Sequence, residues 1–165
     1  AFMSTAVKAA GFLILLRLLA LGQAGVVPGL QWWLPALSVA TMTLGNLLAL
    51  RQQNIQRLLA YSSIAHVGYL LAAVWAWTQQ PGSAPPATVY LYLVAYLFMN
   101  TGAFLFLKVT GISELRRLRG FAGRSPGLAA FFCLMLLSLG GIPPTGGFLA
   151  KFFVFWDLLS KFFHS

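Results

Sequence analysis

The stretch GGIPPTGGFLAKFFVF, residues 140–155, interrupts an apolar segment with four glycines and two prolines and then places Lys151 among phenylalanines. Proline lacks a backbone N–H donor and disfavours the helical state of the residue before it. Glycine adds conformations that other residues avoid. The stretch therefore predicts a helix that is broken near residues 140–147, with a charged side chain just beyond the break.

The apolar segment around this break covers residues 127–163. A straight helix of that length would extend roughly 55 Å at about 1.5 Å per residue. The hydrocarbon core of a bilayer is only about 30 Å thick, so the segment must tilt strongly, fold back or break, and we expect the break. Four other apolar stretches precede it, at residues 2–21, 33–50, 58–77 and 87–107.

The composition explains why lipid is the expected solvent. Hydrophobic residues make up 59% of the 165-residue chain and charged residues only 8%, against about 25% charged in ordinary soluble domains. Stretches of about 20 apolar residues have the length of spanning helices. We therefore predict an all-α, polytopic transmembrane helix bundle with residues 1–165 as a single transmembrane region. Both ends fall inside helix-like patterns, which leads us to expect a fragment of a longer subunit.

The distribution of charge predicts the orientation. The net charge is +9, but we expect no nucleic-acid partner, because the basic residues gather in two links between apolar stretches. Links 51–57 and 108–126 carry two arginines, and four arginines with a lysine, whereas links 22–32 and 78–86 are uncharged. The positive-inside rule makes the two basic links cytoplasmic. Tryptophans expected to form an aromatic belt fall near the opposite face: Trp32, Trp33, Trp75 and Trp77.

Lys151 is the first candidate site residue, because a charge inside a bilayer costs at least a few kcal/mol and usually marks function. The nearest acid in the sequence, Asp157, lies six residues later. That offset is about 240° around a helix, so the two side chains do not share a face. Lys151 either belongs to a proton or ion pathway or is a structural ammonium bound by helix-end carbonyls.

Lys8 and His66 are the other two candidates. Lys8 follows Ser4 and Thr5 by one turn, which makes a short polar stripe. It is either a functional lysine of the membrane interior or a residue that reaches the inner interface. His66 lies near the middle of the third apolar stretch, next to hydroxyl groups, and histidine exchanges protons near neutral pH. It is either a proton carrier or a hydrogen-bonded core residue. Polar residues that extend this face are Ser62, Ser63, Tyr69, Tyr96 and Asn100.

The chain lacks the motifs of a redox or metal centre. Cys133 is the single cysteine, which excludes an internal disulfide and a multi-cysteine metal site. Its apolar neighbours predict a small buried side chain. The sequence has no glycine-rich phosphate loop and no HExxH motif. We therefore expect no metal and no cofactor in this chain, whose lysines and histidine handle protons rather than electrons.

Three segments resemble a known family. These are GNLLALRQQNIQRLLAYSSIAHVGYLL at residues 45–71, LSLGGIPPTGGFLAKFFVF at residues 137–155 and STAVKAAGF at residues 4–12. They are similar to subunit N of the bacterial proton-pumping NADH:quinone oxidoreductase, respiratory complex I, the counterpart of mitochondrial subunit 2. The related M subunit usually has glutamate at the position of Lys151. Gln56 and Ala150 depart from residues common in N subunits.

The resemblance implies an antiporter-like fold of two inverted five-helix repeats, in which the five stretches here correspond to helices eight to twelve. A discontinuous helix in such folds commonly lies near the midplane site. By this resemblance Lys151 is the terminal lysine of the second half-channel, and Lys8 belongs to the central hydrophilic axis. His66 matches a polar position between the two halves.

The implied function is proton translocation coupled to quinone reduction in the bacterial inner membrane. NADH, FMN, iron–sulfur clusters and quinone are expected in other subunits of the complex. The expected partners are the antiporter-like M subunit, the small K and J type subunits and the lipid bilayer. Two alternatives stay open: a subunit of a Mrp-type sodium/proton antiporter, and a purely structural subunit of the membrane arm.

Overall fold

The computed structural model describes residues 2–22, 30–79 and 87–163. These residues form helices joined by short links, and within them the only β-type pairing is an isolated bridge. The prediction of an all-α fold is confirmed. The helices are α1 (Phe2–Gly22), α2 (Leu30–Leu50), α3 (Ile55–Thr78), α4 (Ala87–Thr110), the 3₁₀ helix η1 (Leu115–Leu118), α5 (Phe121–Arg124), α6 (Pro126–Gly140) and α7 (Gly146–Phe163).

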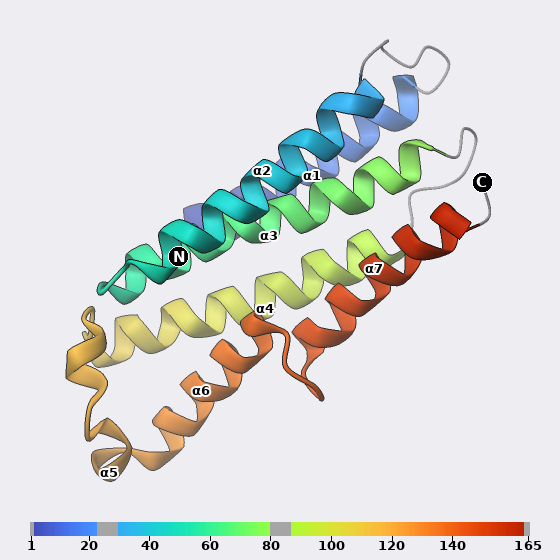
Figure 1. Cartoon of the computed structure of the whole chain (residues 1–165). Coiled ribbons are helices and arrows are strands. Elements are labelled where there is room, and N and C mark those ends of the chain that lie inside the picture. The colour runs from blue at the N-terminus through green and yellow to red at the C-terminus, as the bar shows by residue number, and fades with distance from the viewer. Residues whose placement is uncertain (1, 23–29, 80–86, 164–165) are drawn as a thin grey trace.

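The long apolar segment at the end of the chain is broken as predicted. α6 ends at Gly140 and α7 begins at Gly146, and the pair runs from one end of the bundle to the other (Figure 1). At about 1.5 Å per residue the two pieces extend roughly 22 Å and 27 Å. The break therefore lies partway along the bundle rather than at either of its ends (Figure 1).

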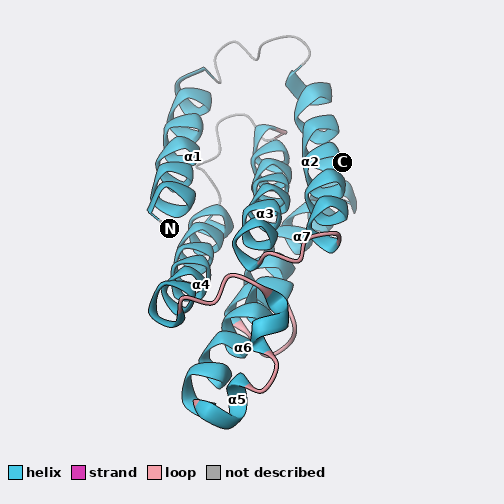
Figure 2. Cartoon of the chain, turned by 90° about the vertical axis from the view of Figure 1, so that its left-hand side faces the viewer, coloured by secondary structure: helices cyan, strands magenta, loops and turns pink. Residues whose placement is uncertain are grey.

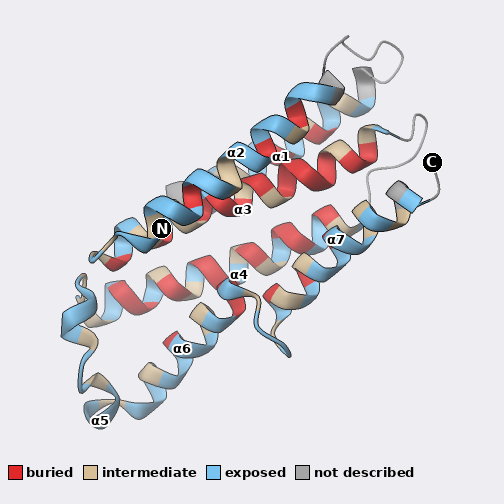
Figure 3. Cartoon of the chain, in the orientation of Figure 1, coloured by how far each residue is buried: buried red, intermediate tan, exposed pale blue. Residues whose placement is uncertain are grey.

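α3 lies at the centre of the bundle. It packs against α1, α2, α4 and α7, and α4 in turn packs against α6 and α7 (Figures 1 and 2). Burial follows this arrangement, because buried residues line α3 and α4 while the outward sides of α2, α6 and α7 are exposed (Figure 3). Val74, Trp77 and Val89 lie in the core, each at most 1% exposed.

The two basic links lie at the same end of the bundle. The Ile55 N–H donates to the Ser113 carbonyl at 2.8 Å, and the Leu115 N–H donates to the Gln53 carbonyl at 3.1 Å. These bonds form a short antiparallel bridge between Asn54 and Glu114. Links 51–57 and 108–126 are therefore joined, as a shared side of the membrane requires, and their cytoplasmic location stays a prediction.

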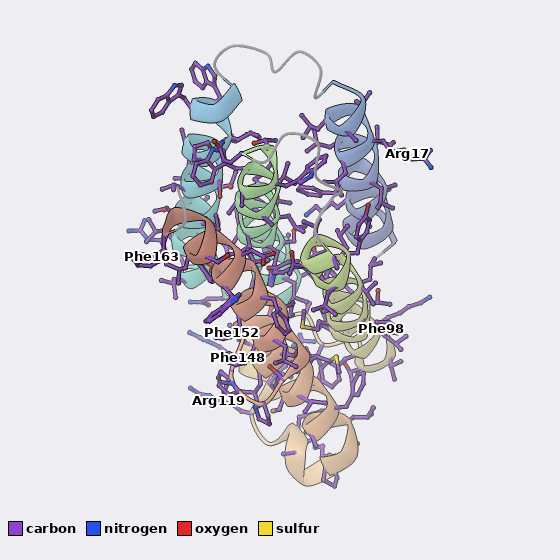
Figure 4. The ribbon with its side chains drawn as sticks, turned by 90° about the vertical axis from the view of Figure 1, so that its right-hand side faces the viewer. Arg17, Phe98, Arg119, Phe148, Phe152 and Phe163 are labelled. Carbon is purple, nitrogen blue, oxygen red and sulfur yellow. The ribbon has the colours of Figure 1, made fainter. Side chains whose placement is uncertain are left out.

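The surface of the bundle is apolar. Three described helices are long and apolar enough to cross a membrane, Trp32–Leu50, Ile55–Thr78 and Ala87–Thr110, and α6 is a shorter apolar helix. Phe98 on α4 is 75% exposed and, like the Arg17 side chain on α1, points away from the bundle (Figure 4). Exposed apolar area on this scale is typical of a protein whose surroundings are lipid. The chain is a multi-pass membrane protein.

Two expectations about single side chains are wrong. Cys133 is exposed, because α6 buries the face that carries Phe132, Ser138 and Leu139 and turns Cys133 away from the bundle. Trp77 is only 1% exposed, because the end of α3 is enclosed by neighbouring helices, and so it is a core residue rather than part of an aromatic belt. Trp32 and Trp33 on α2 are 74% and 76% exposed, as a belt requires.

Candidate functional site

The end of α6 provides binding groups for Lys151. Gly141 has a φ of 82°, and its N–H and that of Ile142 return to the carbonyls of Ser138 and Leu137, both at 3.1 Å. This Schellman pattern satisfies part of the helix end. The next two carbonyls, of Leu139 and Gly140, accept hydrogen bonds from Lys151 Nζ at 2.9 Å and 3.1 Å.

Lys151 thus folds back from the first turns of α7 onto the C-terminal end of α6. A cation at that position interacts favourably with the partial negative charge of the helix end. The break supplies these carbonyls, because an unbroken helix would use them for its own hydrogen bonds. The first candidate residue is therefore held by backbone atoms that the glycine–proline stretch leaves available.

Gly147 allows the start of α7 to lie against the end of α6. Its N–H donates to Ser138 Oγ at 3.0 Å, and Ser138 in turn contacts the sulfur of Met99 on α4. A Cβ atom at residue 147 would overlap the Ser138 carbonyl group. Only glycine fits this close approach, which sets the relative position of Lys151 and its carbonyl partners.

α3 contributes an aromatic face to the same site. The ring of Tyr69 lies with its centroid 5.1 Å from Lys151 Nζ, within the range of a cation–π contact. The ring of Phe155, one turn beyond Lys151 on α7, packs edge-on against Tyr69 at 6.0 Å between centroids. These contacts fix Lys151 against the central helix of the bundle.

His66 lies near both lysines. It is 3% exposed, and its Nδ1 shares a hydrogen bond of 2.6 Å with the Tyr92 hydroxyl on α4. It faces the backbone of Leu139, whose carbonyl also binds Lys151, and both Lys8 and Lys151 lie close enough to act on it electrostatically. The structure therefore brings the three predicted site residues together around α3.

Lys8 reaches this group through a hydroxyl. Its Nζ donates a hydrogen bond to Ser63 Oγ, and Ser63 also donates to the Ala60 carbonyl at 2.6 Å. Ser63 interacts in addition with the side chain of Tyr96, whose ring lies 5.2 Å from that of His66. Lys8 is half-buried. The side chains of Ser4 and Thr5, which were predicted to form a polar stripe with Lys8, are not among the described side chains.

Asp157 and Lys151 have separate partners, in agreement with their predicted helical offset. The Asp157 carboxylate accepts a hydrogen bond of 2.7 Å from Thr88 Oγ1 at the start of α4. In the described part of the chain, no three His, Cys, Asp or Glu side chains gather as metal ligands.

A cavity of about 610 Å³ reaches Lys151 and His66 from the end of the bundle that carries the basic links. At that end it is bounded by Gln52 and Leu115, which belong to the two joined links. Ser62 and Tyr69 line its inner part. A water-filled passage between the link end and the two candidate residues is sterically possible, because the volume exceeds that of many waters.

Some members of the site were not predicted. Tyr92 binds His66 and is 1% exposed, and Thr88 binds Asp157. Both precede Tyr96 and Asn100 at four-residue intervals, and Asn100 Nδ2 donates to the Tyr96 hydroxyl at 3.2 Å. The same four-residue spacing, continued from Tyr96 toward the N-terminus, reaches Tyr92 after one turn and Thr88 after two. This spacing is the sequence signal that could have identified both residues.

The fold and the site define the class of protein: a multi-pass helical membrane protein with a broken helix and two lysines bound inside the bundle. Residues 1–162 match the family of transmembrane proteins described as NADH:quinone oxidoreductase/Mrp antiporter, and the chain belongs to this family. The predicted resemblance is therefore confirmed at the level of the family.

The similar proteins narrow the resemblance within that family. The chain is 42% identical to NADH-quinone oxidoreductase subunit N 2 of Sorangium cellulosum over 97% of its length, which is 33% of that protein. It is 42% identical to subunit N of Rubrobacter xylanophilus and 44% identical to subunit N 1 of Roseiflexus castenholzii, in each case over 94% of this chain and 32% of the relative. The chain spans about a third of the length of these curated relatives. The specific similarity to subunit N, predicted from residues 45–71 and 137–155, is confirmed.

Proposed function

We propose that the chain is the proton-translocating part of an N-type subunit in a bacterial NADH:quinone oxidoreductase, and that Lys8, His66 and Lys151 carry the protons. The observation that supports this most is the arrangement around α3. Lys8 binds Ser63, His66 binds Tyr92, and Lys151 binds the Leu139 carbonyl that His66 also faces. Groups that exchange protons thus follow one another across the interior.

In this proposal protons reach the site from the cytoplasmic side. The cavity between the link residues and Lys151 is the route, with water inside it passing protons to Lys151 and His66. Each step moves one proton between a lysine nitrogen and a neighbouring water or histidine, so that one N–H bond breaks as an O–H or N–H bond forms, or the reverse. Electrons stay in partner subunits, which hold NADH, FMN, iron–sulfur clusters and quinone. The partners are an M-type antiporter-like subunit and the small K and J type subunits of the inner membrane.

The test replaces Lys151 in the complete subunit within the assembled complex. Lys151→Met keeps the length of the side chain and removes the exchangeable proton. We expect NADH-driven proton translocation in vesicles to fall at least about tenfold, the scale of losing one proton-transfer group. Lys108→Met is the matched control, because Lys108 is exposed at the link end of α4. It should leave translocation unchanged.

The same experiment separates the alternatives. If Lys151 is purely structural, its ammonium serves only to bind the carbonyls at the end of α6. Complexes that assemble with Lys151→Met should then translocate protons normally. Sodium-dependent proton exchange by vesicles without NADH would instead favour a Mrp-type antiporter. Either result would overturn the proposal.

A further inference from the structure

α4 carries a line of polar side chains that enters the interior of the bundle. Thr88, Tyr92, Tyr96 and Asn100 follow at four-residue intervals, which places them on one helix face. The last three are between 1% and 3% exposed, and Thr88 is half-buried. The line therefore runs along the inner face of α4, from the level of Asn100 to the first turn of the helix.

Asp157 lies at the end of this line. Its Oδ2 accepts a hydrogen bond of 2.7 Å from Thr88 Oγ1, which joins α7 to the first turn of α4. The chain has only two acidic residues, and the other, Glu114, is exposed in the link at the opposite end of the bundle. A carboxylate within an apolar membrane segment is costly and usually functional. One hydroxyl donor occupies only part of its acceptor capacity, so water can also bind it.

The line connects Asp157 with the candidate site. Tyr92 is one turn from Thr88 and shares a 2.6 Å hydrogen bond with His66. Along α7, Asp157 is six residues beyond Lys151, a rise of roughly 9 Å toward the end where α4 begins. The cavity that reaches Lys151 comes from the other end, at the basic links. Asp157 and that cavity thus lie on opposite sides of the lysine.

We infer that Asp157 is the proton acceptor on the outward side of Lys151, and that Thr88 is the residue that positions its carboxylate. The inference rests on the proposed function. The carboxylate takes one proton that leaves Lys151 and arrives by way of His66, Tyr92 and intervening water, and becomes a carboxylic acid. It then releases that proton to water at the end where α4 begins. Lys151 regains a proton from water in the cavity at the link end, so the protein returns to its starting state.

The test uses Asp157→Asn in the complete complex. Asparagine keeps an oxygen that accepts the Thr88 hydrogen bond but carries no exchangeable carboxyl proton. We expect proton translocation to fall at least about fivefold, with a normal amount of subunit in the purified complex. Asp157→Glu restores a carboxyl group and should recover more than about half of the rate. Glu114→Gln is the control, because it removes the other carboxylate of the chain and should change nothing.

Substitutions of Thr88 distinguish whether Asp157 accepts protons or only makes a structural contact. If the hydrogen bond only joins α4 to α7, Asp157→Asn translocates normally and Thr88→Val reduces assembly, which overturns the inference. If Asp157 accepts protons, Thr88→Val assembles with a rate lowered about twofold, and Thr88→Ser restores it. Measuring proton translocation by Lys151→Met in parallel separates the inference about Asp157 from the proposed function. Loss of translocation there, with a normal Asp157→Asn variant, refutes this inference alone, whereas normal translocation by both variants refutes the proposed function as well.

Discussion

Lys151 and Lys8 are both half-buried and both contact the central part of the bundle, but different kinds of groups bind them. Lys151 binds two backbone carbonyls that the break between α6 and α7 leaves available. Lys8 belongs to the unbroken helix α1 and binds the side-chain hydroxyl of Ser63. A lysine inside a membrane protein can therefore be accommodated either by interrupting a helix or by placing a hydroxyl on the neighbouring helix.

The difference has a consequence for substitution. The carbonyl partners of Lys151 belong to the backbone, so no side-chain replacement at Leu139 or Gly140 removes them. They are disturbed only by changing the geometry of the break. The partner of Lys8 is a single hydroxyl, which one substitution deletes. The following predictions test this contrast.

Gly147→Ala should have the largest effect, because the added methyl group overlaps the Ser138 carbonyl and forces α6 and α7 apart. Overpacking of this kind costs about 2–3 kcal/mol, and it also moves Lys151 away from its carbonyl partners. We expect a lower melting temperature of the complete subunit and loss of proton translocation.

Gly146→Ala is the matched control for that change, since a Cβ atom at residue 146 meets open space. It should be neutral or slightly stabilising, because alanine favours the helix that begins there. Equal behaviour of the two alanine variants would show that the close approach at the break does not determine the geometry of the Lys151 site.

Ser63→Ala should have the next largest effect, through Lys8. A hydrogen bond to a charged group contributes about 2 kcal/mol, which corresponds to roughly a tenfold or greater change in rate if Lys8 carries protons. Translocation measured against Thr43→Val, which changes an exposed hydroxyl on α2, would reveal this loss. A Ser63→Ala complex that translocates at the rate of Thr43→Val would mean that Lys8 does not depend on this hydroxyl.

The broken helix and the positions of the helices follow from local features of the sequence. Pro143 and Pro144 interrupt a segment too long for one span, and two basic links and two uncharged links separate the apolar stretches. The burial of individual side chains does not follow, because a helix that is apolar on all sides carries no amphipathic signal for its inward face. Cys133 and Trp77 were assigned wrongly for this reason.

The charged and polar members of the site were predictable, because a charge within an apolar segment is costly and can be recognised from the sequence. Lys8, His66 and Lys151 stood out, and the structure groups them around α3. Their binding partners were harder to predict, because Leu139 binds Lys151 through its backbone carbonyl and a backbone contact has no sequence signature. Tyr92 is a common core residue type whose role depends on which helix faces it.

Tyr92→Phe tests whether the two lysine sites are connected through His66. The substitution removes the 2.6 Å hydrogen bond to His66 Nδ1 and leaves that buried nitrogen without the hydroxyl. The cost is about 1 kcal/mol, so translocation should fall roughly fivefold. Tyr90→Phe, which changes an exposed hydroxyl on the same helix, should have no effect. If both variants translocate equally, the His66–Tyr92 bond is structural and the two lysines work without it.

The smallest expected effect concerns the aromatic contact of Lys151. Tyr69→Leu removes the ring 5.1 Å from Nζ, whereas Tyr69→Phe keeps it. A cation–π contact is worth about 0.5–1 kcal/mol in partly exposed sites, so Leu should slow translocation by roughly twofold to fivefold and Phe should not. The hydroxyl variant thus serves as the control for the ring variant. Were Phe as harmful as Leu, the hydroxyl rather than the ring would be the important group. Lys151 would then resemble Lys8 in depending on a side-chain oxygen, and the contrast between a backbone-bound and a hydroxyl-bound lysine would no longer hold.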